Sequence, residues 1–595
     1  MPVKHDSRFG LGGHHRYIGP VIVLVAAVFA VAPLLFRGPS CGHDFDFHLV
    51  SWFDCLNSWR HGIFYPHWTA SANYGAGEPR FVFYPPLTWM LGAALGAILP
   101  WTLVPVALTF LLLAGTGLAT RKLAREALPD GAATLAGCAA LFSGYALYTA
   151  YERTAYGELA GGFWIPLLLL YALRNRAASA SKFSRALDGS TVPLALVVAG
   201  CWFSNVPLGV MACYLLAAVA ITAAVLDRSV APVIRATIAG ALGIALSALY
   251  LIPAVWEQRW IDVRQAITDP LDQIENRLLF SQHPIPSLIF HGIPQPKVLG
   301  IALSMIFVTL VSLLLSRRMG KLPLGRRWWI PLALIPVAIL FLQFPFSLPI
   351  WNLLPKLRFL QFPWRWLVTL EAPMAIFFAA AVWSRESARR RIALAVILAL
   401  FVVSALAFTT RYFFQACDDE DAVSSMVDVY GGGAGFVGTD EYAPPGSDDT
   451  LVASGLAAGC LTLDASTALG EPLNGSEAAP VWNAAQGRCE TTLKWQIDQP
   501  EHKRIRAVLS HAGFVILRLR SYPAWQLKIN GSPIPPQPRR DDGLMVVPVR
   551  PGTVDLTADW TATPDVVASR WLTALAVLLL AGLWFVERKP SHSHL

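Results

Sequence analysis

The residues best suited to chemistry lie in a polar, aromatic-rich stretch, Cys41 to Pro86, between two apolar segments. Near its start, residues 43–48 read His-Asp-Phe-Asp-Phe-His. In an extended backbone, Asp44, Asp46 and His48 would point the same way. Two carboxylates so placed could share a divalent cation such as Mg²⁺ or Mn²⁺, or leave one free to act as a base. The alternative is a solvated loop whose acids do no chemistry.

A second charged segment follows at residues 151–158, Tyr-Glu-Arg-Thr-Ala-Tyr-Gly-Glu. Glu152 and Glu158 could complete a carboxylate site with Asp44 or Asp46. The alternative is an ion pair of Arg153 at a membrane boundary.

A third segment, residues 357–366, places arginines among aromatic side chains. The planar guanidinium groups of Arg358 and Arg365 suit a phosphate or pyrophosphate at the depth of the lipid headgroups, because they donate in pairs. Alternatively, the tryptophans form an interfacial belt and the arginines only extend their side chains to the headgroups. That alternative does not account for Gln361 and Pro363 between them.

The composition of the chain indicates the kind of protein that holds these residues in place. Hydrophobic residues make up 55% of the 595 and charged residues only 14%, and the mean hydropathy is +0.48. A soluble chain would carry about a quarter charged residues, so this is an integral membrane protein. The net charge of +8 does not indicate nucleic-acid binding. The basic residues lie in short clusters at the ends of apolar spans, as cytoplasmic loops do under the positive-inside rule.

We predict a polytopic α-helical membrane protein with about twelve spans and both termini in the cytoplasm. A membrane domain over 1–409 would carry a large first outer loop, 37–86. The segment 87–99 is too short to cross a bilayer, so we expect it to be re-entrant or interfacial. The predicted spans are 18–36, 102–119, 131–150, 161–173, 191–204, 207–226, 236–254, 297–316, 328–345, 366–384, 392–409 and 568–586.

Residues 410–567 differ from the rest, being polar and mostly without helical periodicity. Alternating runs at 514–520 and 525–529, followed by Asn530-Gly531, indicate a β-hairpin, because both residues of a type I′ turn need positive φ. We predict an extracytoplasmic β-sandwich-like domain here, before a final helix and cytoplasmic tail at 568–595. In an oxidising compartment, Cys41–Cys55 and Cys460–Cys489 are plausible disulfides, although sequence does not fix the pairing.

Several ordered motifs resemble a known family. The chain is similar to the bacterial membrane family labelled 6-pyruvoyl-tetrahydropterin synthase-related, which resembles YfhO-like proteins. The soluble pterin enzyme and its zinc histidines have no counterpart here. The matching segments are Gly42–Leu49, Tyr65–Trp68, Tyr74-Gly75, Phe83–Leu87, Tyr156–Leu159, Leu360–Arg365, Gly438–Tyr442 and Tyr522–Trp525.

This resemblance implies a GT-C-like fold, that of the C superfamily of glycosyltransferases, which take sugar from a polyprenyl-phosphate donor. By analogy, Asp44 or Asp46 would deprotonate an acceptor hydroxyl, with metal help if a cation binds there. Arg365, with Arg358, would hold the lipid phosphate and stabilise the leaving group. Glu158 would position the acceptor or a metal. The remaining candidate substrate-binding residues are His43, His48, Glu152 and Gln361.

The expected function is therefore sugar transfer from a lipid-linked donor to a cell-envelope acceptor, on the outer face of a bacterial cytoplasmic membrane. Besides membrane lipids, donor and acceptor are the expected partners. Apart from Glu371, the predicted spans hold essentially no ionisable groups, whereas ion-coupled transporters usually need them. A lipid or polysaccharide transporter, or a non-catalytic envelope scaffold, are the alternatives. Loss of activity on Asp44→Asn or Asp46→Asn would separate a transferase from both.

Overall fold

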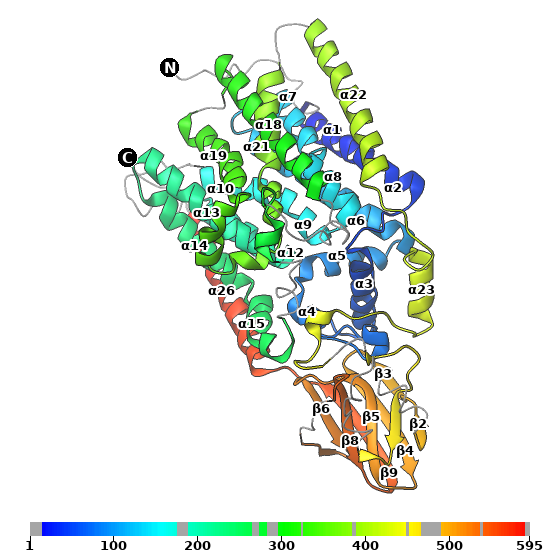
Figure 1. Ribbon diagram of the computed structural model, residues 1–595. Helices are drawn as coiled ribbons and strands as arrows, with labels where there is room; N and C mark the ends of the chain where they lie inside the picture. The colour runs from blue at the N-terminus through cyan, green and yellow to red at the C-terminus, as the bar shows by residue number, and fades with distance from the viewer. Residues whose placement is uncertain are drawn as a thin grey trace.

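The computed structural model describes residues 15–174, 189–263, 273–281, 295–322, 325–383, 388–447, 451–465, 489–535 and 540–588. A bundle of apolar helices forms most of the molecule, and a β domain lies beyond one end of it (Figure 1). Between them lie α3 and α4, which belong to the predicted first outer loop, and α5, which covers most of the segment 87–99 that was expected to be re-entrant or interfacial. This layer positions the candidate site.

Seven described helices or helix runs are long and apolar enough to cross a membrane, or up to ten if each of three bent pairs is one span. Two shorter apolar helices, Tyr17–Ala30 and Thr191–Ser204, overlap the other two predicted spans but are not long enough to be counted with them. The seven are Trp101–Ala124, Asp130–Arg153, Tyr156–Leu173, Val206–Asp227, Pro296–Arg318, Leu394–Tyr412 and Pro564–Glu587. The bent pairs are Ala231–Leu246 with Ala248–Trp260, Arg326–Leu342 with Pro345–Leu353, and Pro363–Thr369 with Glu371–Val382.

The described α-helices run as follows. They are α1 (His15–Ala30), α2 (Ala32–Arg37), α3 (Phe45–Arg60), α4 (Arg80–Phe83), α5 (Pro86–Gly96), α6 (Val104–Ala124), α7 (Asp130–Leu141), α8 (Gly144–Tyr148), α9 (Tyr156–Leu159), α10 (Gly161–Leu173), α12 (Thr191–Ser204), α13 (Val206–Asp227), α14 (Ala231–Leu246), α15 (Ala248–Trp256), α17 (Ile274–Arg277), α18 (Gln295–Arg318), α19 (Arg326–Leu342), α20 (Leu348–Leu353), α21 (Glu371–Val382), α22 (Ala388–Tyr412), α23 (Val423–Gly431) and α26 (Pro564–Arg588).

Short tight turns join several of these helices. They are the 3₁₀ segments η1 (Asn73–Gly75), η2 (Trp101–Leu103), η4 (Glu257–Trp260), η6 (Pro345–Ser347), η7 (Leu357–Leu360), η8 (Pro363–Thr369) and η9 (Asp440–Tyr442), and the π-helical turn η3 (Thr149–Arg153).

Polar contacts tie the basic ends of the helices to one another. Arg327 pairs with Asp227, and its Nε donates to the carbonyl of Leu173. Arg174 pairs with Glu126. The C-terminal end of α26 reaches the same end of the bundle, since the Glu587 carboxylate accepts from the backbone N–H groups that begin α12. The helix ends that the positive-inside rule grouped together are therefore neighbours in space.

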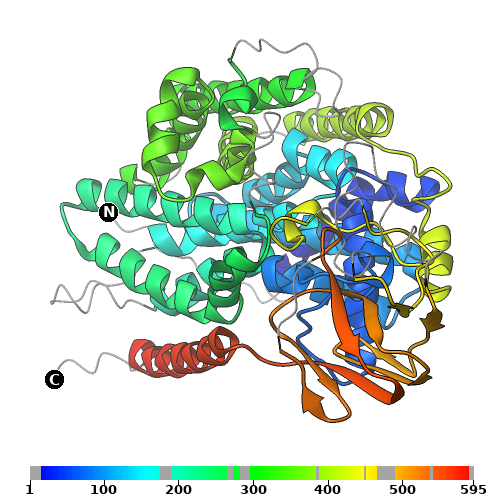
Figure 2. The same cartoon turned by 60° about the horizontal axis from the view of Figure 1, so that its bottom comes forward.

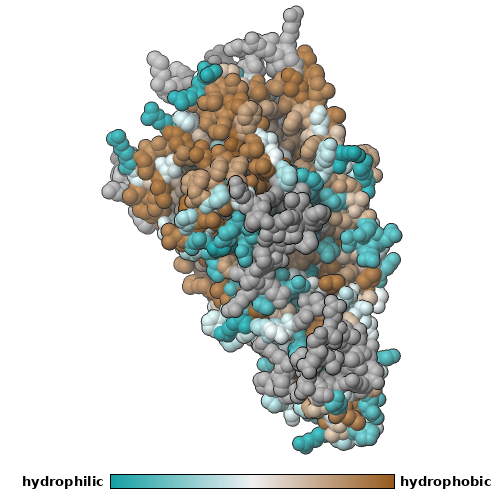
Figure 3. All heavy atoms as spheres, in the orientation of Figure 1, coloured by the Kyte–Doolittle hydropathy of each residue, from teal (hydrophilic) through white to brown (hydrophobic). Residues whose placement is uncertain are grey.

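The surface of the bundle is apolar, as a membrane environment requires. Figure 3 shows hydrophobic residues gathered over the helices, with polar residues more frequent toward the β domain. Large apolar side chains on α13, α18, α22 and α26 are exposed, among them Val225, Phe307, Leu400 and Leu578. Water would penalise such a surface, whereas lipid tails do not.

The β domain consists of two antiparallel sheets that share one apolar core. Their strand orders are β2-β1-β5-β8 and β3-β4-β9-β6-β7. Leu517 of β5 and Leu556 of β9 are buried in the same cluster. The predicted hairpin at Asn530-Gly531 forms, with both residues at positive φ. The strands are β1 (Gly459–Thr462), β2 (Thr491–Leu493), β3 (Ile497–Gln499), β4 (His502–Leu509), β5 (Gly513–Arg520), β6 (Trp525–Ile529), β7 (Ser532–Pro533), β8 (Leu544–Val549) and β9 (Gly552–Trp560).

The β domain packs against the layer of the first loop. Trp68 of that loop inserts among the rings of Tyr522, Trp525 and Trp560. Figure 2 shows the domain over one side of the bundle's end, while the helices of residues 206–246 extend beyond it.

The cysteines correct one prediction and confirm another. Cys460 pairs with Cys489, as expected, with Cα atoms 5.5 Å apart. Cys41 pairs with Cys417, 376 residues later, and not with Cys55, which is buried and free. Cys55 lies within α3, where its side chain packs into the apolar core. The Cys41–Cys417 bond fastens the start of the first loop to the chain that follows α22.

Candidate functional site

The start of the first loop docks on the π-helical turn η3. A π turn leaves backbone carbonyls without their usual helical donors. The N–H groups of His43 and Asp44 use two of them, donating to the carbonyls of Glu152 at 3.3 Å and Arg153 at 3.0 Å. A Cβ on Gly42 would lie 2.4 Å from the Glu152 carbonyl oxygen. Only glycine allows this approach, so Gly42 determines where Asp44 lies.

The extended backbone expected for residues 43–48 is wrong, because α3 begins at Phe45 and Asp44 is its N-cap residue. Positions two apart on a helix point to nearly opposite sides. Asp44 faces Arg153, whereas Asp46 is exposed and lines a separate pocket with residues 419–421. Nor do the described residues contain any group of three or more His, Cys, Asp or Glu side chains placed to hold a metal ion. The donors therefore do not fit a cation shared by Asp44 and Asp46.

Asp44 and Glu158 instead meet through Arg153. The Arg153 guanidinium is 2.6 Å from Glu158 Oε2 and 3.9 Å from Asp44 Oδ2. The Tyr145 hydroxyl donates to the other Glu158 oxygen. Glu158 is 1% exposed, and a carboxylate so buried needs such partners. The ion pair of Arg153, considered above as an alternative, thus forms inside the site.

Arg365 also lies beside the Glu158 carboxylate, but it forms no hydrogen bond with it through Nε. Its Nε lies 3.3 Å from Glu158 Oε2 without hydrogen-bond geometry, and its Nη1 donates to the Leu360 carbonyl at 2.8 Å. Arg365 is 8% exposed. A single buried carboxylate, Glu158, therefore faces two guanidinium groups, and one of them is short of acceptors. A buried guanidinium with unused donors is poised for an anion.

Three guanidinium groups surround the ring of Phe362. Those of Arg365, Arg277 and Arg153 lie 4.8, 5.2 and 5.6 Å from its centroid. Gln361, at a φ of +57°, makes the turn that delivers this ring between η7 and η8. Each separation is within the cation–π range. Because like charges repel, an anion among them would stabilise the cluster.

Two other predicted site residues have partners away from this cluster. Arg358 is exposed, and it pairs with Glu275 at 2.6 Å while also donating to Asn352. The Glu152 carboxylate accepts from Lys297 Nζ at 2.9 Å. The structure thus brings Asp44, Glu158 and Arg365 together and leaves Arg358 outside.

His48 is enclosed one turn into α3. It is fully buried among aromatic rings, with Tyr156 at 5.0 Å and Tyr84 at 5.7 Å between centroids, and neither ring nitrogen has a hydrogen-bond partner. Burial lowers the pKa of His48 to about 4, so the imidazole is neutral at neutral pH. A side chain so enclosed does not reach a substrate without rearrangement.

Asp44 is the accessible acid of this network, with 29% of its side chain exposed. Burial alone would raise its pKa. The hydrogen bond from His43, 2.6 Å away, and the charge of Arg153 overcome that effect and hold the pKa of Asp44 well below its usual range. Conversely, that hydrogen bond raises the pKa of His43. Asp44 is thus an ionised carboxylate at the edge of the arginine cluster.

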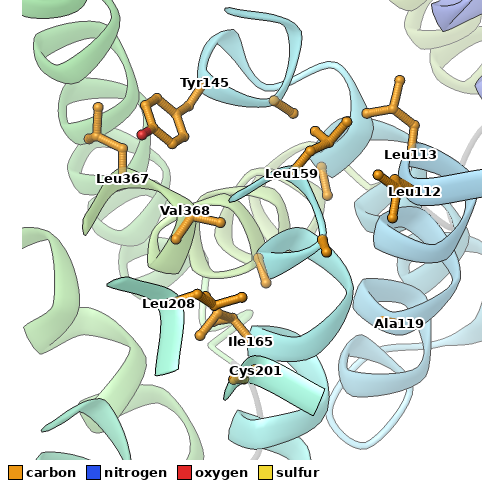
Figure 4. Packing of buried hydrophobic residues seen from close by; sticks show 14 of the residues in the cluster. Leu112, Leu113, Ala119, Tyr145, Leu159, Ile165, Cys201, Leu208, Leu367 and Val368 are labelled. Atoms are coloured by element: carbon orange, nitrogen blue, oxygen red, sulfur yellow. The ribbon is translucent and has the colours of Figure 1, made fainter. Parts of the chain in front are cut away.

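The cluster rests on a rigid apolar layer. Figure 4 shows Tyr145 beside Leu367, with Val368 and Leu208 below them and Leu159 on the opposite side of the view. All five are buried. A Cβ on Gly161 would lie 2.8 Å from Val368 Cγ2, so glycine lets α10 approach η8 closely. This packing fixes the spacing between Glu158 and Arg365.

The sequence-based interpretation missed Arg277 and underrated Arg153. Arg277 lies in the four-residue helix α17, away from every motif singled out above. Its one signal was a basic residue on the predicted outer side, where the positive-inside rule disfavours one. Arg80 was also missed. It is buried and pairs with the fully buried Glu78 at 2.7 Å, which stiffens the first loop.

Comparison with known proteins identifies the family. Residues 81–412 match the model of the 6-pyruvoyl-tetrahydropterin synthase related domain, described as a membrane protein. That is more than half of the chain. The protein belongs to this family. Much of the site, from Glu152 to Arg365, lies within the matched residues, whereas Gly42, His43 and Asp44 precede them. No curated protein matches the chain.

Two solved structures are similar at low identity. Archaeal oligosaccharyltransferase AglB from Archaeoglobus fulgidus, in complex with an inhibitory peptide and a dolichol-phosphate, has 13% identity and a TM-score of 0.42, covering 69% of this chain and 57% of that one. Arabinofuranosyltransferase AftD from Mycobacteria has 15% identity and a TM-score of 0.42, covering 67% and 27%. The chain thus spans less than two thirds of either protein. A similarity of this size assigns no role to any residue.

Proposed function

We propose that this member of the 6-pyruvoyl-tetrahydropterin synthase related family transfers a sugar from a polyprenyl-phosphate donor to a cell-envelope acceptor, on the outer face of the membrane. The proposal depends on the state of the Arg365 side chain. It is a buried guanidinium with unused donors, and it shares Glu158 with Arg153. An anion that reaches this place from the membrane, as a lipid phosphate would, supplies the missing acceptors.

In this mechanism the arginine cluster holds the donor phosphate. Arg365 and Arg277 donate to its oxygens, and Arg153 remains paired with Glu158. As the acceptor's hydroxyl oxygen bonds to the anomeric carbon and the sugar–phosphate bond breaks, negative charge builds up on the phosphate, which leaves as polyprenyl phosphate. Guanidinium groups already fixed around Phe362 stabilise that charge without having to reorganise.

Asp44 receives the acceptor's proton. Its carboxylate is ionised and partly exposed at the edge of the cluster. A base with so low a pKa is weak, but a phosphate bound at Arg365 and Arg277, beside Arg153, would offset part of the positive charge that lowers it. Donor binding would therefore raise the basicity of Asp44 as it brings the sugar to the site.

The resemblance of the sequence to glycosyltransferases of the C superfamily supports the reaction class. The position of the site supports its sidedness. Asp44, Glu158 and Arg365 lie at the opposite end of the bundle from the basic clusters, which we assign to the cytoplasm by the positive-inside rule.

The test compares donor binding with transfer in the purified full-length protein reconstituted in nanodiscs. We expect Asp44→Asn to bind undecaprenyl phosphate as wild type does but to transfer no sugar from a radiolabelled undecaprenyl-phosphate sugar to envelope material. Asp428→Asn, which changes an exposed acid on α23, is the control and should retain transfer. Equal transfer by wild type and Asp44→Asn would refute the role of Asp44. No undecaprenyl phosphate binding by wild type would refute the proposal itself.

A further inference from the structure

A second hollow lies on the other side of α3 from the arginine cluster. Its volume is about 540 Å³, within the range of roughly 300–1,000 Å³ typical of small-molecule sites. One wall comes from the first loop, through Asp46, Phe47 and Tyr74, and the other from residues 419–439. Two distant parts of the chain thus build one pocket.

The two walls are fixed to each other. The Cys41–Cys417 disulfide lies just before residues 419–421. Tyr74 donates its N–H to the Phe436 carbonyl, and Phe436 donates to the Ser71 carbonyl, both at 2.9 Å. A Cβ on Gly438 would lie 2.1 Å from Asn73 Oδ1. The pocket is therefore preformed, because neither wall can move without breaking these contacts.

The lining combines aromatic rings with hydrogen-bond acceptors. Phe47, Tyr74 and Phe436 contribute rings, and Tyr74 does so from a left-handed backbone with φ of +51°. Such a conformation is costly for a tyrosine and persists only where the surroundings impose it. Asp46, Glu420 and Asp421 contribute carboxylates. Burial, together with the nearby charges of Asp418 and Asp46, raises the pKa of Asp421.

The one arginine in the lining does not make this pocket an anion site. Arg80 is paired with Glu78, and its Nη1 donates to the Phe47 carbonyl and to Ser51. The acids therefore dominate the surface that a ligand meets. A phosphate or a uronic acid would be repelled, whereas hydroxyl groups would find acceptors and the C–H face of a sugar ring would find aromatic faces.

We propose that this pocket binds the acceptor as a neutral or amino-bearing saccharide. The inference rests on the proposed function, which requires an acceptor near Asp44, and it adds the acceptor's chemical class and location. The pocket and the arginine cluster flank the first turn of α3. An acceptor held on the Asp46 side would need only its terminal hydroxyl to reach past that turn to Asp44.

The test measures saccharide binding without any donor. Full-length protein in nanodiscs, free of glycoside detergents, is screened against a panel of soluble neutral, amino and uronic oligosaccharides. We expect a neutral or amino oligosaccharide to bind, and uronic ones to bind at least about tenfold more weakly. Tyr74→Asn, which tolerates the left-handed backbone, and Asp421→Asn should each weaken binding at least about tenfold. Asp428→Asn, an exposed acid on α23 outside the pocket, should leave it unchanged.

Three results would overturn the inference. These are binding of no saccharide by wild type, binding that Tyr74→Asn and Asp421→Asn leave intact, or tighter binding of tetralysine than of any saccharide at the same pocket. Each preparation is also assayed for undecaprenyl phosphate binding, which reports that the variant is folded. If that lipid binds and no saccharide does, the pocket inference fails while the proposed function stands.

Discussion

Replacing Arg365 tests the physical basis of the proposed donor site. The wild-type guanidinium is buried, has an unused Nε, and shares its one carboxylate with Arg153. One hydrogen bond to a charged partner contributes about 1.5–3 kcal/mol. Arg365→Ala should therefore weaken undecaprenyl phosphate binding by roughly ten- to hundredfold. Arg365→Lys keeps the charge but not the planar fork, so it should fall between wild type and alanine.

Arg358→Ala is the matched control. Arg358 lies seven residues earlier, and its guanidinium is half exposed and paired with the partly exposed Glu275. An exposed ion pair contributes about 0–1 kcal/mol, so this change should alter binding less than about fivefold. Arg277→Gln, at the ring of Phe362, should weaken binding by about tenfold.

Binding is measured by native mass spectrometry or by titration with a fluorescent polyprenyl phosphate in nanodiscs, at one fixed salt concentration. Size-exclusion profiles and thermal unfolding establish that each variant is folded. The reasoning is refuted if Arg365→Ala and Arg358→Ala weaken binding equally, or if folded Arg365→Ala binds as wild type does. Loss of binding in Asp44→Asn would also contradict it, because that acid is placed to act on the acceptor.

Three further predictions concern the first loop. Gly42→Ala should destabilise the protein by about 1–3 kcal/mol and impair transfer, because its Cβ would meet the Glu152 carbonyl, whereas Gly240→Ala, in open space on α14, should be neutral in thermal unfolding. The pKa of His43, measured by NMR, should exceed 6.5 in the wild type and fall back toward 6.5 in Asp44→Asn. The stabilisation from the His43–Asp44 pair is then fully present below pH 6.5 and is lost as the pH rises through the pKa of His43. An unshifted His43 pKa in the wild type would contradict the pairing. Cys417→Ser should lower stability by about 2–4 kcal/mol and speed proteolysis near residues 417–447, while Cys55→Ser should leave the disulfide bonds intact in peptide mapping.

The sequence by itself determined the class of protein and the elements of the fold. Apolar runs longer than a bilayer core leave few alternatives to helices, since lipid offers no partner for backbone polar groups. The basic clusters predicted which helix ends lie together, and the contact of Arg327 with Asp227 and Leu173 bears this out. Asn530-Gly531 predicted the hairpin because the turn needs positive φ at two successive residues, and these two residue types adopt it readily.

Only the tertiary structure decided how the chemical groups meet. Alternation at residues 43–48 was interpreted with an extended backbone, but docking on the carbonyls of η3 and packing of Phe45 and Leu49 into the core favour a helix, which separates Asp44 from Asp46. Sequence spacing likewise could not pair Cys41 with Cys417 or bring Arg277 to Phe362. These contacts join residues tens to hundreds of positions apart. Their geometry depends on how whole helices pack, whereas a sequence pattern reports only on neighbours along the chain.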